Sequence, residues 1–282
     1  MRVAVVQMNV GTSKQANVER ALRLIDEAAG QGAELIVLPE YATFIAPESE
    51  YAAVAEALPG ATSARFAAKA REHGIYLHPG SFVEVSPVPG KFYNTSYLLD
   101  PAGEVVAVYR KVHLFDIDVP GEVTDKESAL IAPGDELVAV ELPEFTIGLT
   151  ICFDLRFPEL YRALAAADCL VMAVPAAWAE ATGRVHWEVL LRARAIENHA
   201  YVVAPCQQGS CEGYPHWGHS MIIDPWGAIL AELPAGDGVV VADVDAAEAR
   251  RRRAQTSVLA VRRPDVYAQA PGTGVSSGSL AT

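Results

Sequence analysis

The apolar residues of this chain fall into short runs, separated by longer segments in which they recur every three or four positions. Residues 3–8 form the first run and predict a strand. Asn17 is expected to cap the helix that follows, and Gly30 and Gly32 to end it. The apolar positions of this helix form one stripe: Val18, Ala21, Leu22, Ile25, Ala28 and Ala29. Residues 34–40 then predict a buried strand that ends at Glu40, so the chain opens as a β-α-β unit.

The same alternation of runs and periodic segments continues along the chain. Helices are predicted over residues 62–73, 158–167 and 184–198, and strands over residues 75–85, 146–151, 170–175 and 201–204. Residues 91–111 and 218–232 predict two hairpins that turn at Asp-Pro-x-Gly. Residues 116–136 are polar and predict a loop long enough to be a lid or a pocket wall.

The two predicted hairpins resemble each other, which indicates an internal duplication. Residues 95–103 and 219–227 share a hydroxyl residue, three apolar residues and then Asp-Pro-x-Gly, and each follows a strand-helix-strand unit. We expect two similar α-β-β halves in one domain, residues 1–271, with two sheets face to face and helices outside. The predicted fold is an α/β four-layer α-β-β-α sandwich, and the Gly- and Ser-rich residues 272–282 are expected to form a flexible tail.

Three chemically reactive residues follow predicted strands: Glu40, Lys111 and Cys152. A carboxylate can take the proton of a thiol, the thiolate can attack an amide carbon, and an ammonium with a backbone N–H can stabilise the oxyanion that forms. Each residue also has a structural alternative. Glu40 and Lys111 could simply face solvent, and Cys152 could fill a core position.

Composition and charge narrow the classes of function. The formal net charge of −13 argues against a nucleic-acid-binding surface, and the basic run at residues 250–253 is expected on an exposed helix face or at a subunit contact. No apolar stretch reaches the ~18 residues of a membrane span, and the first residues lack the pattern of a signal peptide.

The four cysteines are irregularly spaced, which favours a reducing, cytoplasmic compartment. Cys206 and Cys211 lie near His216 and His219 in the sequence, but their spacing matches no standard zinc pattern, so no metal is expected.

Three segments resemble the nitrilase, or carbon–nitrogen hydrolase, superfamily: Leu38-Pro-Glu-Tyr41, Tyr109-Arg-Lys-Val-His-Leu-Phe115 and Ile151-Cys-Phe-Asp-Leu-Arg-Phe-Pro-Glu159. The resemblance covers residues 2–268 and implies a thiol amidase of the same sandwich fold, without a cofactor. It implies Glu40 as general base and acid, Lys111 as oxyanion stabiliser and Cys152 as nucleophile. The backbone N–H of Phe153 would join the oxyanion site. A second, auxiliary glutamate would be Glu127, with Glu122 as the weaker alternative.

Within the superfamily the chain looks most like the Nit branch, amidases that act on ω-amides of small 2-oxo acids or on deaminated glutathione. Residues 113–121 and 183–198 carry this likeness. Such substrates bear carboxylates, and Arg156 is placed to bind one, unless it pairs with Asp154 or Glu159 instead. Trp178 either lines the pocket or is ordinary packing. The resemblance also implies a homodimer or larger even-numbered assembly through residues 158–167, 184–198 and 261–268.

Three other functions stay open at this point. The chain could be an N-carbamoyl amino acid amidohydrolase or an aliphatic amidase of the same superfamily. It could also be a Cys–His hydrolase that uses His113 as its base, which would leave Glu40 and Lys111 without a role. Finally, it could be a catalytically silent binding protein.

Overall fold

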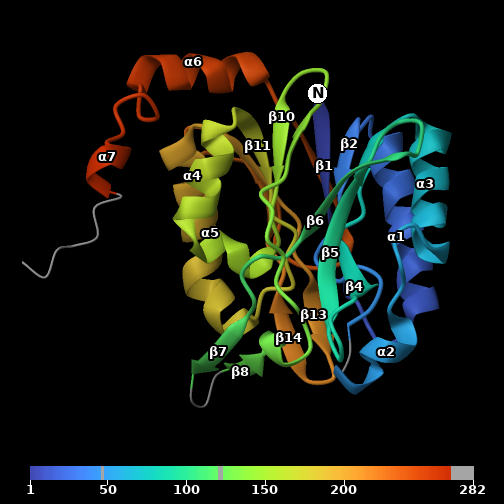
Figure 1. The fold of residues 1–282 in the computed structure, drawn as a ribbon. Helices are drawn as coiled ribbons and strands as arrows, with labels where there is room; N and C mark the ends of the chain where they lie inside the picture. The colour runs from blue at the N-terminus through green and yellow to red at the C-terminus, as the bar shows by residue number, and fades with distance from the viewer. Residues whose placement is uncertain (46–47, 120–122, 268–282) are drawn as a thin grey trace, which may run out of the picture.

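The computed structural model describes residues 1–45, 48–119 and 123–267, which build two β-sheets packed face to face (Figure 1). The first sheet has seven strands in the order β17-β1-β2-β3-β5-β4, with β6 beside β5. Strands β1, β2 and β3 are parallel, and β17 pairs antiparallel with β1 along six residues. The bounds of the strands are β1 (Arg2–Gln7), β2 (Leu35–Val37), β3 (Tyr76–His78), β4 (Ser81–Val85), β5 (Phe92–Leu99), β6 (Val105–Arg110) and β17 (Gly238–Asp243).

The second sheet repeats this plan with six strands in the order β16-β15-β12-β11-β10-β9. Its central strands β10, β11 and β12 are parallel, and β15 and β16 form the hairpin predicted from the second Asp-Pro-x-Gly turn. The bounds are β9 (Ala139–Glu141), β10 (Thr146–Leu149), β11 (Cys169–Ala173), β12 (Tyr201–Ala204), β15 (Ser220–Ile223) and β16 (Ile229–Leu233).

Helices cover the outer face of each sheet, as Figure 1 shows: α1 (Lys14–Gly30) and α3 (Ala61–His73) on the first, α4 (Pro158–Ala166) and α5 (Glu180–Asn198) on the second. Strand β1 shows the layering in its side chains. Val3 and Val5 join the core between the sheets, whereas Ala4 and Val6 pack in the core beneath α1 and α3. The predicted four-layer α-β-β-α sandwich is confirmed.

Several boundaries differ from the prediction. Helix α1 begins at Lys14 and is capped by Ser13, whose side chain accepts from the N–H of Ala16, so the prediction of Asn17 as the cap was wrong. Asn17 is instead buried within the first turns, where its carboxamide bonds the backbone of Gly11. Helix α5 begins at Glu180, one turn before the predicted start.

The segment over residues 116–136 is not a plain loop. It contains the hairpin of β7 (Asp116–Val119) and β8 (Val123–Lys126), followed by the 3-10 turn η2 (Glu127–Ala129). Each of these strands has only four residues, and Thr124, Asp125 and Lys126 are polar in succession, so no strand pattern was recognised in the sequence. A second small hairpin, β13 (Gln208–Cys211) and β14 (Tyr214–Trp217), was also not predicted. The short helices η1 (Glu48–Glu50) and α2 (Tyr51–Val54) complete the first half.

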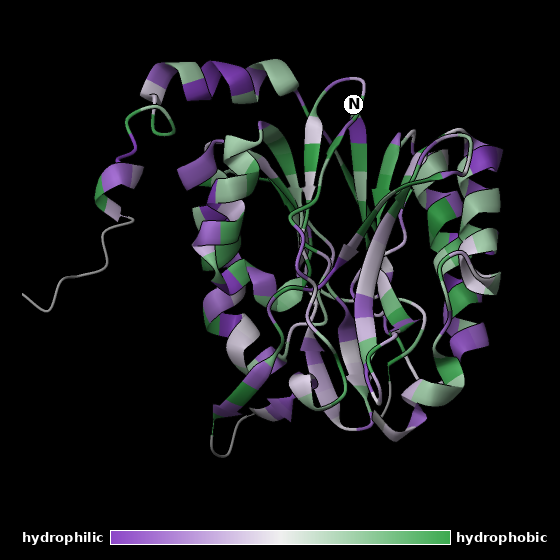
Figure 2. Ribbon diagram, in the orientation of Figure 1, coloured by the Kyte–Doolittle hydropathy of each residue, from purple (hydrophilic) through white to green (hydrophobic). Residues whose placement is uncertain are grey.

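The basic run lies on α6 (Ala246–Thr256), an exposed helix that carries many hydrophilic residues (Figure 2). Its arginines are held within the chain: Arg252 pairs with Glu248 at 2.7 Å, and Arg253 pairs with Asp168 at 2.9 Å. Helix α7 (Pro264–Tyr267) projects from the body beyond α6 (Figure 1). The predicted tail, residues 272–282, lies outside the described residues. No helix among the described residues is long and apolar enough to cross a membrane.

Candidate active site

The three reactive residues of the sequence converge at the strand ends of the two sheets. Glu40 follows β2, Lys111 follows β6 and Cys152 follows β10 as the first residue of η3 (Cys152–Arg156). All three are buried, with 2 %, 2 % and 7 % of their surface exposed. The chain therefore does not leave Glu40 and Lys111 in solvent, which removes the structural alternative for both.

Sharp turns present two of these side chains. Tyr41, directly after Glu40, and Cys152 both adopt positive φ, +51° and +46°, which is uncommon for residues with a side chain. Gly80 lies against the Glu40 turn at φ +74°. A Cβ on Gly80 would come within 1.8 Å of the carbonyl oxygen of Pro39, so only glycine fits there.

Lys111 joins two carboxylates. Its Nζ lies 3.0 Å from Oε1 of Glu40 and 2.9 Å from Oε2 of Glu127. Glu127 is the first residue of η2, is also buried, and accepts the backbone N–H of Phe115 at 2.7 Å. Glu127 is thus a second buried carboxylate beside Lys111. The weaker alternative, Glu122, lies outside the described residues.

Asn94 on β5 and a backbone N–H complete the bonding of the carboxylates. The Nδ2 of Asn94 donates to Glu40 at 2.8 Å and to Glu127 at 3.1 Å, and the N–H of Ala177 donates to Oε2 of Glu40 at 2.8 Å. The hydroxyl of Tyr41 donates to Glu127 at 3.2 Å. Sequence reasoning missed Asn94, because the burial of the polar residues 94–96 within a strand is visible only in the structure.

Burial and the charges of Glu40, Glu127 and Lys111 shift the pKa values of Lys111 and Cys152. Burial lowers the pKa of the Lys111 ammonium, but the charges of Glu127 and Glu40 outweigh burial, so its pKa lies well above the ordinary value. Burial, followed by the charge of Glu40, raises the pKa of the Cys152 thiol well above its usual range, and Lys111 opposes this only in part. Lys111 is therefore a permanent cation, and Cys152 rests as a thiol that needs a base.

The turn that carries Cys152 is fixed by Asp154, which is fully buried. Its carboxylate accepts the N–H of Ile151 at 2.8 Å and the hydroxyl of Tyr109 at 2.7 Å. The Nδ1 of His113 lies 2.7 Å from the same carboxylate, and the ring of His113 stacks on Phe157 at 3.7 Å. His113 thus supports the Cys152 turn through Asp154, and this placement speaks against His113 as the base of a Cys–His hydrolase.

A cavity of about 350 Å³ opens above these residues. Its lining includes Glu40, Lys111 and Glu127, together with Cys152 and Phe153. The segment around the start of α5 and the β13–β14 hairpin also line the cavity. Their lining residues are Trp178, Ala179, Thr182, Cys211, Glu212, Tyr214 and His216. The β7–β8 segment contributes Asp125, so it is part of the pocket wall, as one form of the loop prediction had it.

Arg156 also lines this cavity, four residues after Cys152. Its guanidinium lies 4.7 Å from the ring centre of Trp178, and its Nη1 lies 3.3 Å from Nδ1 of His186. Within the described residues Arg156 forms no ion pair, so the alternative pairing with Asp154 or Glu159 is not observed. Burial lowers the pKa of Arg156, because the cation is partly removed from water and no carboxylate among the described residues compensates its charge.

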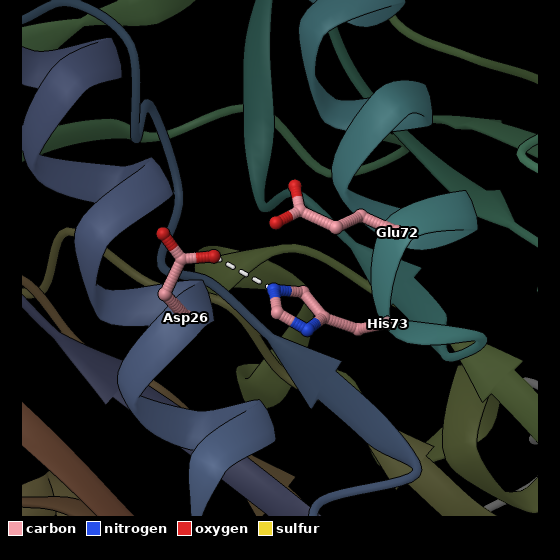
Figure 3. A group of neighbouring side chains, drawn as sticks. All are labelled: Asp26, Glu72 and His73. Atoms are coloured by element: carbon pink, nitrogen blue, oxygen red, sulfur yellow. Dashed lines mark hydrogen bonds and ion pairs between the residues drawn. The ribbon is translucent and has the colours of Figure 1, made fainter.

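Among the described residues, only Asp26, Glu72 and His73 place three metal-ligand atoms together (Figure 3). They lie on α1 and α3, and none of the three lines the cavity. The ammonium of Lys69 already pairs with Asp26 at 2.6 Å and with Glu72 at 2.9 Å. The cluster is thus a set of ion pairs between two helices, and Cys206, Cys211, His216 and His219 form no such group.

A buried thiol beside a glutamate, a lysine and a second glutamate, at the strand ends of an α-β-β-α sandwich, defines an amide-hydrolysing site. The chain belongs to the carbon–nitrogen hydrolase family, which it matches over residues 2–254. It is 38% identical to the human protein "Omega-amidase NIT2" over 269 residues, which cover 95% of this chain and 96% of the human one.

Two solved structures are similar in fold. The NitFhit protein of C. elegans gives a TM-score of 0.87 at 34% identity, covering 94% of this chain and 66% of that one. A glutamate-to-glutamine mutant of the amidase from Nesterenkonia sp. AN1 gives 0.79 at 28% identity, covering 95% of each chain. That mutant carries the acetamide moiety of fluoroacetamide on its active-site cysteine. The family and the fold expected from the sequence are thereby confirmed.

Proposed function

We propose that this protein is an ω-amidase, which hydrolyses the terminal amide of a small 2-oxo dicarboxylic acid monoamide to the acid and ammonia. The observation that carries the proposal is the presence in one cavity of a complete Glu40–Lys111–Cys152 cluster and of Arg156, a half-buried cation that has no carboxylate partner among the described residues. Similarity to the NIT2 proteins along nearly the whole chain supports it.

The reaction begins with the Cys152 thiol as a proton donor. Glu40 accepts the thiol proton while the sulfur attacks the amide carbon, which forms the C–S bond and an oxyanion. The ammonium of Lys111 and the N–H of Phe153, at the start of η3, stabilise that oxyanion. Glu40 then gives its proton to the leaving nitrogen, the C–N bond breaks, and ammonia departs from a thioester.

Water completes the cycle. Glu40 removes a proton from a water molecule, the resulting hydroxide attacks the thioester, and a second oxyanion forms in the same place. The C–S bond then breaks, the acid is released and Cys152 regains its proton. Glu127 and Asn94 do not need to exchange protons in this sequence. Their hydrogen bonds hold Lys111 and Glu40 within reach of the sulfur.

Arg156 supports a substrate that bears a carboxylate. The Arg156 guanidinium is half-buried and forms no ion pair with a described residue, so it can bind a carboxylate through a charge-assisted, bidentate contact. Trp178, whose ring faces this guanidinium, keeps Arg156 in place against the cavity wall. Amides without a carboxylate would leave the cation uncompensated, which favours an ω-amide over a simple aliphatic amide.

The test is product release from a panel of substrates. Ammonia is measured with 2-oxoglutaramate, 2-oxosuccinamate, an N-carbamoyl amino acid and propionamide, and the amine product, cysteinylglycine, is measured with deaminated glutathione, which releases no ammonia. The proposal requires the highest kcat/KM for one of the two 2-oxo ω-amides, with ammonia and without carbon dioxide, whereas a preference for deaminated glutathione would identify that substrate class instead. A preference for the N-carbamoyl amino acid, with carbon dioxide released beside ammonia, would identify the carbamoylase alternative instead. Absence of turnover with every substrate would favour a silent binding protein.

The same proposal includes a homodimer or larger even-numbered assembly and a reducing, cytoplasmic location. Val185, Val189 and Ile196 are 62 %, 66 % and 45 % exposed, and their spacing places them along one side of α5. Val261 and Tyr267, near and on the projecting α7, are also exposed. Sedimentation of the protein and of Val189→Glu tests the assembly, since a charge at a dimer contact should yield monomers. All four cysteines are free thiols, as a thiol enzyme in a reducing compartment requires.

A further inference from the structure

Four residues that line the cavity each carry a buried polar atom without a hydrogen-bond partner among the described residues. The atoms are Nε of Arg156, Nε1 of Trp178, the hydroxyl of Tyr214 and Nδ1 of His216. Buried polar groups in folded proteins are nearly always paired. Glu40, Lys111 and Glu127, by contrast, bond one another. The four residues are therefore the part of the lining with hydrogen-bonding capacity left for a ligand.

Tyr214 and His216 act from the same face of β14. They are two residues apart in a strand, so their side chains point to the same side, and their ring centres lie 5.9 Å apart. The strand is fixed beside the cavity, because the N–H of Trp217 donates to the carbonyl of Trp178 at 2.9 Å. Gly183 on α5 allows this approach, since a Cβ there would lie 2.3 Å from the ring of Trp217.

Both groups are uncharged near neutral pH. Burial lowers the pKa of His216 to about 4, and burial together with the charge of Asp125 raises the pKa of Tyr214 to about 12. Arg156 is therefore the cation among the four residues, and Tyr214 and His216 are neutral hydrogen-bonding groups.

The hydrogen-bond donors among these four residues determine which functional groups a ligand must carry. The N–H groups of Arg156 and Trp178 can only donate, and the Tyr214 hydroxyl can donate as well. A 2-oxo acid presents only acceptors at this end, three oxygens in all, whereas a 2-amino acid presents an ammonium that would face these donors. Asp125 and Glu212 also line the cavity and are the groups that could favour an ammonium instead.

We infer that Tyr214 and His216 form a neutral subsite that hydrogen-bonds the 2-oxo group of the substrate, next to a carboxylate held by Arg156. The inference rests on the proposed function and deepens it, because it assigns the residues that distinguish a 2-oxo amide from its 2-amino or unsubstituted counterpart. Trp178 contributes its N–H to the same end of the ligand.

Kinetics with three matched substrates test the subsite: 2-oxosuccinamate, succinamate, which lacks only the oxo group, and asparagine, which has an amino group instead. In Tyr214→Phe and in His216→Phe, kcat/KM for 2-oxosuccinamate should fall about tenfold, the loss of one neutral hydrogen bond, while that for succinamate changes little. Tyr93→Phe, which removes a hydroxyl outside the cavity lining, should change neither value. Equal losses for the two amides, no loss, or a preference for asparagine would overturn the subsite.

A second readout does not depend on turnover. Alkylation of Cys152 by iodoacetamide, followed by mass spectrometry, reports occupancy of the cavity by 2-oxoglutarate or glutarate. In the wild type, 2-oxoglutarate should protect the thiol at a several-fold lower concentration than glutarate, and Tyr214→Phe should remove this advantage. Equal protection by both diacids in the wild type would overturn the inference even if the amidase proposal holds. Selective protection with no amide hydrolysis would overturn the amidase proposal and leave the subsite standing.

Discussion

Asn94 offers a sharp test of how the buried charges are held. Its Nδ2 is within 2.8 Å of Glu40 and 3.1 Å of Glu127, and the residue is fully buried. In Asn94→Ala both hydrogen bonds disappear, and two carboxylates remain with the single ammonium of Lys111. A hydrogen bond to a charged group contributes about 1.5–3 kcal/mol.

The magnitude follows from these contacts. If the loss of one such bond raises the barrier by about 3 kcal/mol, kcat/KM falls roughly 150-fold, since ~1.4 kcal/mol corresponds to a factor of ten. Asn94→Asp should be worse than Asn94→Ala near neutral pH, because a third carboxylate would then face Glu40 and Glu127 in a buried site.

The assay is steady-state ammonia release combined with thermal unfolding. Asn198→Ala is the matched control, because Asn198 is equally buried and its Nδ2 donates to the carbonyl of Arg194 at 2.9 Å, away from the cavity lining. That control should lower the melting temperature and spare kcat/KM. The reasoning is refuted if Asn94→Ala keeps wild-type kcat/KM, or if both variants lose the same share of activity.

Three further outcomes are expected. Arg156→Leu should raise KM for a carboxylate-bearing amide about 10- to 150-fold and leave propionamide hydrolysis nearly unchanged; an equal effect on both amides in steady-state assays would contradict carboxylate binding. Gly183→Ala would place its Cβ 2.3 Å from the Trp217 ring, so the melting temperature measured by calorimetry should fall. An unchanged melting temperature would show that β14 can shift away from α5 without loss of stability. Burial lowers the pKa of His78 to about 4. As the pH falls, His78 is therefore protonated near pH 6.5 in the unfolded chain but only near pH 4 in the folded chain. The free energy of unfolding should therefore be highest above pH 6.5 and fall by up to about 3 kcal/mol as the pH drops to 4. In urea unfolding measured across this pH range, His78→Gln should lose less unfolding free energy than the wild type, and an identical loss would exclude His78 as a source of the pH dependence.

The sequence was most informative where local chemistry and periodicity agree. The alternation of buried runs with amphipathic helices predicts the sandwich, and Glu40 and Cys152 stand out because each ends an apolar run with a reactive group. Glu127 could be placed only by resemblance. Its partner Lys111 precedes a hairpin of two four-residue strands, which are too short and too polar to be recognised from the sequence.

Other parts of the site depend on contacts between distant segments. Asn94 looks like a strand residue until the fold places it beside its partner Glu40, 54 positions away in the chain. Tyr214 and His216 lie on a four-residue strand too short for periodicity to reveal. Strand β17 joins β1 across the length of the chain, a pairing that no local pattern encodes.

The central claim is that amide hydrolysis passes through a thioester on Cys152, with Glu40 as the base. Rapid acid quenching during turnover of 2-oxosuccinamate, followed by peptide mass spectrometry, tests this claim most directly. The account predicts that the peptide containing Cys152 transiently gains the mass of the substrate minus ammonia, and that Glu40→Gln forms this adduct far more slowly. Steady hydrolysis with no adduct at any time, or an adduct on Cys169, Cys206 or Cys211 instead, would contradict it.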